Sequence, residues 1–495
     1  MSVTLNELEE HLWAAANILR GTVDSGTYKN YVFALLFLKR LSDVWQEEYE
    51  LKLSEYGDAS LAADADEHRF DLPKGHRWTD IRKYTTNMGE HLNVAFRAIE
   101  DANSKLRGVF QNVDFNQKEQ FSDELLERFL QHFERYDLRN SNVEADMLGN
   151  AYEYLIKQFA DDGGQRGGEF YTPKQVVRLM VECLEISDGM SVYDPTCGSG
   201  GMLLEAYRAV ERGGKNPRSL SLYGQERNLN TWAICQMNLF LHDIDDADVR
   251  RGDTLREPKH LVSEGSRALR SFDRVIANPP FSLKEWGHTS WAGGDIYGRD
   301  VYGCPPASYG DLAFVQHMLA SLKDNGKLAV VVPHGVLFRA GSEGAIRKAF
   351  IEHDLVEGVI GVAPNLFYGA GIPAAILFLR KQKPEHMRGK VMIVNGAELY
   401  EKGTAQNYLR DGHIKTLSET YLAFEDVERL AKAVPVADIA ANDFNLNITR
   451  YVNLGEAAEQ IDVAVEVERL MELVAERDAA EQKMTQHLRE LGYVE

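Results

Sequence analysis

The stretch that decides the fold is VYDPTCGSGGML, which spans Val192 to Leu203. An apolar strand pattern leads into an Asp-Pro pair, and Gly198, Gly200 and Gly201 then precede a helical pattern. Glycines allow the backbone to approach a ligand without a Cβ clash, and the first turn of the following helix has free N–H groups. This order predicts a nucleotide-type binding loop at the carboxyl end of a first parallel strand.

The loop differs from the dinucleotide fingerprint. That pattern requires a third glycine three residues after the second, where Leu203 stands. Taken alone, a glycine-rich turn is also typical of a tight turn that binds nothing. The stretch by itself therefore predicts either a ligand loop or a bare turn.

The sequence around this loop alternates between two patterns. Short apolar runs predict buried strands, and they read MSVYDP, LSLYGQE, FDRVIANPP, GKLAVVVP and LVEGVIGVA. Between them lie helical patterns, which read GMLLEAYRAVERG, NTWAICQMNLFLH, DLAFVQHMLASL and GAIRKAFIEH. Strands that alternate with helices predict a parallel sheet covered on both faces. We therefore expect a doubly wound α/β domain over residues 151–450, with a glycine-rich hinge at 161–168.

Helical regions flank this domain. Residues 1–150 contain few Gly or Pro, and apolar residues recur at helical spacing in YKNYVFALLFLKRLSDVW, so we expect an N-terminal helical domain. Residues 451–495 include a stretch without Gly or Pro from Ile461 to Leu491, whose apolar residues are spaced by four and three. This spacing predicts a long amphipathic helix that packs either on its own domain or on a helix of a partner.

Composition limits the class of protein. The 495 residues exceed one ordinary domain, and 44% hydrophobic residues are enough for packed cores. The chain shows neither a secretory pattern nor an apolar run that could span a bilayer, so we expect a cytoplasmic protein without membrane contact. The four cysteines, at 183, 197, 235 and 304, form no CxxC pair, which indicates isolated reduced thiols rather than a metal site or a disulfide framework.

Two acidic residues close later strands. Glu226 ends the strand after the glycine loop, and an acid at that spacing accepts hydrogen bonds from both ribose hydroxyls, which favours an adenosine-containing ligand. Asp253, in RRGDTL, ends another expected strand and can accept from the adenine amino group of the same ligand. The alternatives are an exposed acid that caps a helix for Glu226 and an ordinary turn aspartate for Asp253.

The tetrapeptide Asn278-Pro279-Pro280-Phe281 follows the strand pattern FDRVIA. Two prolines cannot continue a ladder, so the Asn278 side chain and the Pro279 carbonyl are fixed at the edge where ligands bind. These two acceptors match the two N–H groups of an exocyclic amine, and Phe281 can stack on a base that has left the duplex. The tetrapeptide alone is equally typical of a rigid strand exit. About 80 residues after the glycine loop, it favours methyl transfer to an amine.

These motifs resemble a known family, the methylation subunits of type I restriction-modification systems. The resemblance covers nearly the whole chain, and the segments GGEFYTPKQVVRLMV, DPTCGSGGML, NPPF, YGDLAFVQHML, GKLAVVVPHGVLF, GIPAAILFL and NDFNLNITRYV stand in the family's order. The order of an additional cofactor motif, the glycine loop and the tetrapeptide resembles the gamma class of amino-methyltransferases. The resemblance implies a Rossmann-like S-adenosylmethionine-dependent methyltransferase fold and site-specific methylation of adenine N6 in DNA.

The resemblance also assigns site residues. It implies that S-adenosylmethionine is bound by Glu169, Phe170, Tyr171, Thr172, Pro173, Lys174, Cys197, Gly198, Ser199 and Glu226. The loop and strand-end positions add Asp194, Gly200 and Asp253 to the expected cofactor site. The resemblance implies that the target adenine is held by Asn278, Pro279, Pro280 and Phe281. From the residues alone, Thr172-Pro173 is only a capped helix start.

Charge and resemblance together point to a partner. A formal net charge of -21 argues against an independent nucleic-acid binder, because phosphate contacts need a surplus of Lys and Arg. The resemblance implies that two methylation subunits assemble with one specificity subunit, which reads the DNA sequence, and a restriction subunit is a further candidate. We expect the C-terminal helix to contact the specificity subunit. The chain has no Walker A pattern, so ATP-driven translocation is not expected of it.

Other functions stay open from the sequence alone. Asn-Pro-Pro-Phe also occurs in similar enzymes that methylate guanine N2 in ribosomal RNA or glutamine amides, and one fold hosts several substrates. An RNA enzyme would more often carry a basic accessory domain, which the N-terminal region does not resemble. A scaffold without catalysis is the other alternative, and we would expect it to lack Asn278 or the glycines, which are present.

The segment Ser282–Gly310 is long and rich in Gly, Trp and Tyr. Segments of this kind inside compact domains are usually functional. We expect it to close over an extruded base.

Overall fold

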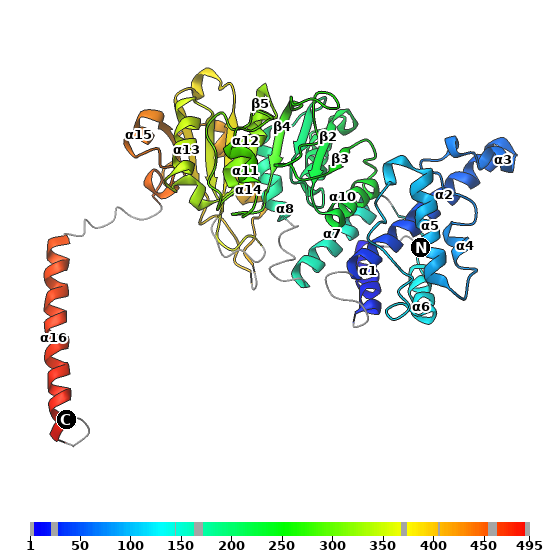
Figure 1. Ribbon diagram of the computed structural model, residues 1–495, viewed down its shortest axis with the longest axis horizontal. Coiled ribbons are helices and arrows are strands. Elements are labelled where there is room, and N and C mark those ends of the chain that lie inside the picture. Colours follow the sequence, from blue (N-terminus) through cyan, green and yellow to red (C-terminus); the bar gives the residue numbers. More distant parts are fainter. Residues whose placement is uncertain are drawn as a thin grey trace. The chain divides into compact units, whose positions relative to one another are not determined.

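The computed structural model (Figure 1) describes residues 4–20, 28–143, 145–162, 172–367, 374–403, 406–453 and 463–490. The predicted site residues Glu169, Phe170 and Tyr171 lie outside the described residues. The chain forms two units, Met1–Val452 and Asn453–Glu495. None of the helices in the described ranges combines the length and the apolar character needed to cross a membrane.

Helices fill the N-terminal part of the chain. Their bounds are α1 (Leu5–Leu19), α2 (Tyr28–Tyr56), α3 (Ala59–Ala62), α4 (Trp78–Ile81), α5 (Met88–Ala102), α6 (Asp123–Phe133) and α7 (Ala145–Asp162). Helix α1 starts at a capping box, in which the Glu7 carboxylate accepts from the Thr4 N–H at 2.9 Å. The first half of α2 is largely apolar all round and almost fully buried, as expected of a helix at the centre of a core. Helix α7 packs against α1.

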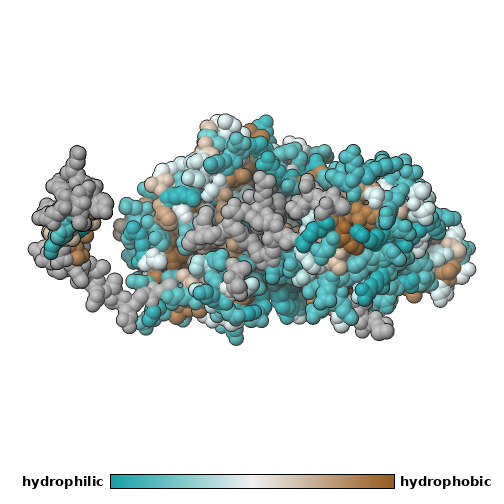
Figure 2. Space-filling model, turned by 90° about the horizontal axis from the view of Figure 1, so that it is seen from below, coloured by the Kyte–Doolittle hydropathy of each residue, from teal (hydrophilic) through white to brown (hydrophobic). Residues whose placement is uncertain are grey.

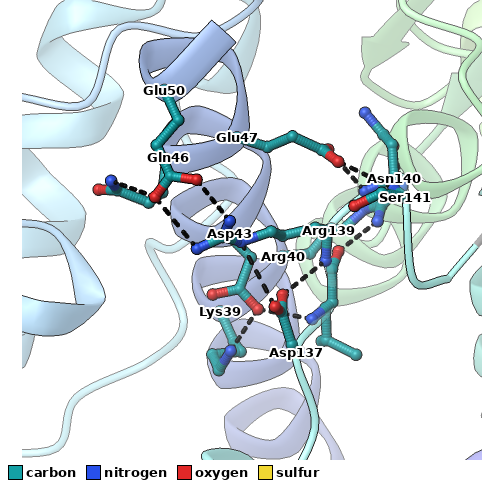
Figure 3. Close-up of polar contacts among 11 residues, drawn as sticks. Lys39, Arg40, Asp43, Gln46, Glu47, Glu50, Asp137, Arg139, Asn140 and Ser141 are labelled. Carbon is teal, nitrogen blue, oxygen red and sulfur yellow. Dashed lines mark hydrogen bonds and ion pairs between the residues drawn. The ribbon is translucent and has the colours of Figure 1, made fainter. Parts of the chain in front are cut away.

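Charged side chains of α2 hold the segment that leads from these helices into α7 (Figure 3). Glu47 accepts hydrogen bonds from the backbone N–H groups of Asn140 at 2.8 Å and Ser141 at 2.9 Å. The buried Arg40 donates to the side-chain oxygen of Asn140 at 2.6 Å and to the carbonyl of Val143 at 3.2 Å. Because these contacts satisfy backbone groups outside regular structure, they fix the path of the chain into α7.

Helices α1 and α6 meet at two stacked histidines. The ring centroids of His11 and His132 lie 4.0 Å apart, the rings are 8° from parallel, and His11 is 6% exposed. Neither ring nitrogen of His11 has a hydrogen-bond partner among the described residues. Burial, with a smaller contribution from the neighbouring His132 and Arg135, lowers the pKa of His11 to about 3. His11 is therefore neutral in the folded chain at all pH values well above 3.

Acid should destabilise the N-terminal helices through His11. The unfolded chain protonates this histidine near pH 6.5 and the folded chain only near pH 3, so the free energy of unfolding falls as the pH drops through that window. The expected loss is about 1 kcal/mol for the first pH unit below 6.5. Urea unfolding of His11→Phe at pH 7.5 and 5.5 checks this, because phenylalanine keeps a stacking ring and removes the titrating group. An equal acid loss in the variant and the parent chain would contradict the assignment.

The α/β part is built on one mixed sheet. Within the described residues it has nine strands in the order β3-β2-β1-β4-β5-β7-β6-β8-β9. The strands are β1 (Ser191–Asp194), β2 (Ser221–Glu226), β3 (Asp248–Arg251), β4 (Phe272–Ala277), β5 (Leu322–Pro333), β6 (Val356–Gly361), β7 (Ala374–Arg380), β8 (Lys390–Asn395) and β9 (Ala431–Pro435). The five apolar runs that predicted strands form β1, β2, β4, β5 and β6.

The expected parallel sheet is wrong at two strands. β7 lies antiparallel between β5 and β6, and β9 lies antiparallel beside β8, whereas the other neighbours are parallel. The residues of β7 come from the continuous apolar run GIPAAILFL. A strand buried on both faces shows such a run whichever way it points, so the composition does not encode its direction.

Helices cover both faces of this sheet. They are α8 (Lys174–Leu184), α9 (Gly201–Arg212), α10 (Leu229–Leu241), α12 (Asp311–Ala320), α13 (Ser342–Glu352), α14 (Asp411–Ala423) and α15 (Val436–Ala441). The short helix α11 (His288–Ala292) lies in the segment between β4 and α12. Alternate strand residues enter two apolar clusters: Val192 packs with α8, α9, α10 and α14, and Tyr193 packs with α12, α13 and α15. The doubly wound architecture is thereby confirmed (Figure 1).

The second unit contains α16 (Val463–Glu490), the long C-terminal helix that the apolar spacing predicted. Leu470, Met471, Leu473, Val474 and Met484 on this helix are each at least 40% exposed. Large apolar side chains exposed on one helix are typical of an interaction surface, and Figure 2 shows hydrophobic residues on the described part of this unit.

Candidate functional site

The glycine-rich stretch forms a tight turn between β1 and α9. Gly198 and Gly200 have positive φ values of 53° and 83°, a region that favours glycine. The N–H of Cys197 donates to the carbonyl of Gln225 at 3.0 Å, and the N–H of Gly200 donates to the carbonyl of Cys197 at 2.8 Å. The turn is therefore fastened to β2, and the first N–H groups of α9 lie at the edge where the parallel strands end.

The turn is also packed closely on α10. A Cβ atom at Gly200 would lie 2.8 Å from the sulfur of Cys235. Asn238, three residues further along α10, donates to the carbonyl of Ser199 at 2.9 Å. Cys197 and Cys235 are free thiols, and their sulfur atoms lie 3.9 Å apart. This packing leaves no room for a side chain at the second glycine of the turn.

Glu226, at the end of β2, binds the turn through its carboxylate. Its Oε2 accepts from the N–H of Gly198 at 3.1 Å, and its Oε1 accepts from the N–H of Asn228 at 2.7 Å. Burial raises the pKa of this carboxyl, and these backbone hydrogen bonds offset part of the rise. Glu226 thus supports the turn directly, and ribose binding by its carboxylate stays a prediction.

Asp253 lies in a turn after β3. Its Oδ1 accepts from the N–H groups of Leu255 at 3.0 Å and Arg256 at 3.2 Å, contacts that are typical of a turn aspartate. Arg227 lies 3.5 Å from its Oδ2. The contact with adenine that the strand-end position assigned to Asp253 stays a prediction.

A cavity lies beside the glycine turn. It is lined by Glu153, Ile156, Thr172, Lys174, Val177, Asp194, Thr196, Cys197, Gly198, Ser199, Gly201, Met202, Glu205, Arg208, Asn238 and Asn278. Of the predicted site residues, it brings together Thr172, Lys174, Asp194, Cys197, Gly198, Ser199 and Asn278. The other predicted residues that the structure describes lie outside this lining, namely Pro173, Gly200, Glu226, Asp253, Pro279, Pro280 and Phe281.

Sequence reasoning missed several residues of the cavity wall. Glu153 belongs to α7, a helix in which no motif was found. Arg208 lies two turns along α9, beyond the glycine loop. Asn238 did carry a signal, because it is a fully buried amide within the apolar helical pattern NTWAICQMNLFLH.

Asp194 lies at the wall of the cavity with its side chain almost completely enclosed. It is 1% exposed, and its Oδ1 accepts from the N–H of Thr196 at 3.0 Å. Burial raises the pKa of this carboxyl to about 8, an effect that the Thr196 hydrogen bond reduces and the charge of Glu226 increases. The raised pKa reduces the negative charge that Asp194 adds to the cavity near neutral pH.

Asn278, directly after β4, meets the additional motif across the cavity. Its Nδ2 donates to the Thr172 hydroxyl at 2.9 Å, a contact between residues 106 positions apart. Its Oδ1 is buried and has no hydrogen-bond partner among the described residues. A buried acceptor without a donor is costly, and a ligand donor is one explanation for its presence. The oxygen that the tetrapeptide was predicted to offer to an amine is thus available at the cavity.

The rest of the tetrapeptide leaves the sheet beside Asn278. Pro279 is buried, Pro280 is exposed, and Phe281 is half-buried. The ring of Phe281 packs edge to face on Phe367, with ring centroids 6.1 Å apart. Base stacking on this ring stays a prediction.

The segment after the tetrapeptide, Ser282–Gly310, is anchored at several points. Trp286 and Trp291 are each 1% exposed. Arg299 forms a buried ion pair with Asp295 at 2.7 Å and donates to two carbonyls of the turn after β3 at 3.0 and 2.7 Å. Closure over an extruded base stays a prediction, and movement of the whole segment would break these contacts.

Comparison with known proteins identifies the family. Residues 143–460 match the model of the N-6 DNA Methylase family, and residues 8–133 match the model of the HsdM N-terminal domain. The chain is 33% identical over 516 residues to the type I restriction enzyme MjaVII methylase subunit of Methanocaldococcus jannaschii, with 99% of this chain and 84% of the relative covered. It is 32% identical over 442 residues to the type I restriction enzyme HindI methylase subunit of Haemophilus influenzae, with 86% of this chain and 95% of the relative covered.

A solved structure agrees with these sequence relatives. The type I restriction-modification system methyltransferase subunit from Streptococcus thermophilus aligns with a TM-score of 0.80 and 31% identity, over 91% of this chain and 100% of that chain. The resemblance drawn from the motifs is thereby confirmed. The chain therefore belongs to the N-6 DNA methylase family, among the methylase subunits of type I restriction enzymes.

Proposed function

We propose that the chain transfers a methyl group from S-adenosylmethionine to N6 of adenine in DNA, as the modification subunit of a type I restriction-modification complex in the cytoplasm. The observation that carries this proposal is the buried Oδ1 of Asn278 at the wall of the cavity, which has no hydrogen-bond partner in the described part of the chain. A nucleoside cofactor also fits the cavity. Its wall contains the glycine turn, which Glu226 supports from outside the lining, and two buried acceptors without hydrogen-bond partners among the described residues. S-adenosylmethionine supplies the electrophilic methyl group when bound.

The residues of the chain orient and polarise the target amine through their position and their hydrogen bonds. Asn278 Oδ1 and the Pro279 carbonyl accept the two N–H bonds of the adenine amino group, which draws its nitrogen toward sp³ character and exposes the lone pair. Phe281 stacks on the extruded base. No group has to remove a proton before attack, so catalysis is mainly orientation and polarisation. Once N6 has gained the methyl group, it carries a positive charge and passes one proton to solvent water.

A methyl-transfer assay tests the proposed function. The purified chain, with and without its candidate specificity subunit, is incubated with labelled S-adenosylmethionine and unmethylated DNA, and the labelled nucleoside is identified after digestion. Label in N6-methyladenine, seen only with the partner, would support both the activity and the assembly. Label with the chain alone would contradict the partner argument. Cofactor binding without any label on DNA would contradict DNA as the substrate.

The partner proposal rests on charge and on α16. A chain with a net charge of -21 is poorly suited to hold DNA phosphates alone. Helix α16 carries exposed Leu470, Leu473 and Val474, which can pack against helices of a partner. We therefore propose that two copies of this chain assemble with one specificity subunit through α16, and that a restriction subunit can join that complex.

Removing the C-terminal helix tests this assembly. Deletion of residues 457–495 is expected to abolish the complex in size-exclusion chromatography and to leave the melting temperature of the remaining chain within about 2 °C, since Met1–Val452 is a unit by itself. The pair of substitutions Leu470→Gln and Val474→Gln should weaken the complex at least about tenfold. The matched control changes Arg477→Gln and Asp478→Asn on the same helix and should have little effect. An intact complex after the deletion would rule out α16 as the contact.

A further inference from the structure

Part of the cavity is lined by side chains of α7, α8 and α9, and we call this part the chamber. Glu153 of α7 forms ion pairs with Lys174 at the start of α8 and, at 3.3 Å, with Arg208 of α9. All three side chains line the cavity. Arg208 also donates to the side-chain oxygen of Asn150 on α7 at 2.8 Å, which holds its guanidinium group beside α7. The chamber thus contains two cations that share one carboxylate.

Lys174 and Arg208 have one ionised carboxylate between them, that of Glu153. Burial alone would raise the pKa of Glu153, but Lys174 and Arg208 outweigh burial and lower it, so Glu153 is ionised. A further acid in the wall, Glu205 of α9, pairs with Arg212 at 2.6 Å. Since Glu153 neutralises only one of the two cations, a ligand carboxylate would supply the missing anion.

An unpaired acceptor lies in the wall of the same cavity. Asn238 of α10 is 1% exposed, and its Nδ2 is used by the carbonyl of Ser199. Its Oδ1 has no hydrogen-bond partner within the described part of the chain. A buried acceptor of this kind is typically satisfied by a ligand or an ordered water. An ammonium group is a donor that fits it.

Cations for a carboxylate and an acceptor for an ammonium group match the two charged groups of an α-amino acid. We propose that Lys174 and Arg208 bind the carboxylate at the amino-acid end of the cofactor, and that Asn238 Oδ1 accepts from its ammonium group. This inference rests on the proposed function, because it takes S-adenosylmethionine as the cofactor. Glu153 is a positioning residue that orients both cations, and its negative charge opposes that of the ligand carboxylate.

The arrangement also links the cofactor to the N-terminal helices. Glu153 lies on α7, which packs against α1. The segment that leads into α7 is held by Arg40 and Glu47 of α2. The residue that orients both cations therefore sits on a helix whose place depends on the N-terminal part of the chain.

Two ligands that differ only in whether they carry the amino-acid end distinguish binding in the chamber from binding in the rest of the site. S-adenosylhomocysteine carries the amino-acid end, whereas 5′-methylthioadenosine keeps the adenosine and the thioether without it. In calorimetric titrations of the full chain, Arg208→Met is expected to weaken S-adenosylhomocysteine about tenfold and to leave 5′-methylthioadenosine within about twofold. Arg208→Lys keeps the charge and should retain most of the affinity. Lys215→Met, an exposed cation after α9, has the same change in net charge and should alter neither affinity.

Glu153→Gln has an expected effect of opposite sign. It removes the like charge and should strengthen S-adenosylhomocysteine binding about threefold, again without effect on 5′-methylthioadenosine. Equal effects of Arg208→Met on both ligands, or no effect on either, would overturn the inference. So would a Glu153→Gln chain that loses S-adenosylhomocysteine affinity. Binding of 5′-methylthioadenosine reports that each variant is folded.

Binding of the two ligands to the parent chain distinguishes a failure of this inference from a failure of the proposed function. A parent chain that binds neither ligand would contradict S-adenosylmethionine as the cofactor. A parent chain that binds both ligands with equal affinity would contradict only the assignment of Lys174, Arg208 and Asn238.

Discussion

Replacing Asn278 by alanine is expected to lower kcat for methyl transfer to DNA about a thousandfold, the size of effect seen when one pre-positioned polar group is removed from a reacting centre. The substitution removes Oδ1, the buried acceptor without a partner, and with it the polarisation of the amine. It also removes one hydrogen bond, to Thr172. That loss costs about 1 kcal/mol of stability, and the removal of an unsatisfied acceptor offsets part of it.

Single-turnover methylation and cofactor titration separate these effects. Affinity for S-adenosylhomocysteine should stay within about fivefold, because one neutral hydrogen bond beside the cofactor contributes about 1 kcal/mol or less. Thr172→Val is the matched control: it removes the partner of Nδ2 but leaves Oδ1, and its kcat should fall only about tenfold. If Asn278→Ala retained more than a tenth of the parent rate, the tetrapeptide would have a structural role only.

Gly200→Ala is the second change with a large expected effect. The backbone at this position has a φ of 83°, which an alanine adopts at a cost of about 1–2 kcal/mol. The added Cβ would lie 2.8 Å from the sulfur of Cys235, and relieving such overpacking costs about 1–3 kcal/mol. We expect a loss of about 3 kcal/mol in the free energy of unfolding and at least tenfold weaker cofactor binding, since the turn forms the cavity wall.

The neighbouring glycine provides the control. A Cβ at Gly201 meets nothing within 4 Å and has no positive φ to adopt, so Gly201→Ala should leave the free energy of unfolding unchanged or slightly higher. In a Cys235→Ala background the clash with the sulfur is absent. Gly200→Ala should then lower the free energy of unfolding by the cost of backbone strain alone, about half of the loss in the parent chain. Chemical denaturation of these variants measures the contributions of backbone strain and of overpacking separately. Equal stability of Gly200→Ala and Gly201→Ala would mean that the turn is not constrained as described.

Much of the α/β part follows from its sequence because local and global signals agree there. The run VYD gives β1, the glycines give the turn, and the apolar spacing after Gly201 gives α9. Strand direction at β7 does not follow, because an apolar run has no polarity. The helical region before residue 150 is predicted as helical, but its contacts are not, since they join residues far apart such as Arg40 and Asn140.

In the candidate site, residues within short motifs could be predicted from the sequence, whereas residues that meet through contacts between helices could not. Asn278 and Thr172 were found from short motifs, and the structure brings them together. Glu153 and Arg208 were not found, because their contact is between two helices and neither residue type is unusual on a helix surface. Asp253 shows the limit of strand-end reasoning: its described contacts are those of a turn.

The strand order has a consequence for synthesis on the ribosome. β1 lies between β2, which follows it closely in the chain, and β4, which begins at Phe272. The edge of β1 that β4 covers therefore waits for roughly 80 further residues, or about 8 s at a translation rate of about 10 residues per second. An unpaired apolar edge is a template for wrong pairing. The nascent chain is thus most exposed to misassembly in the interval between its first and fourth strands.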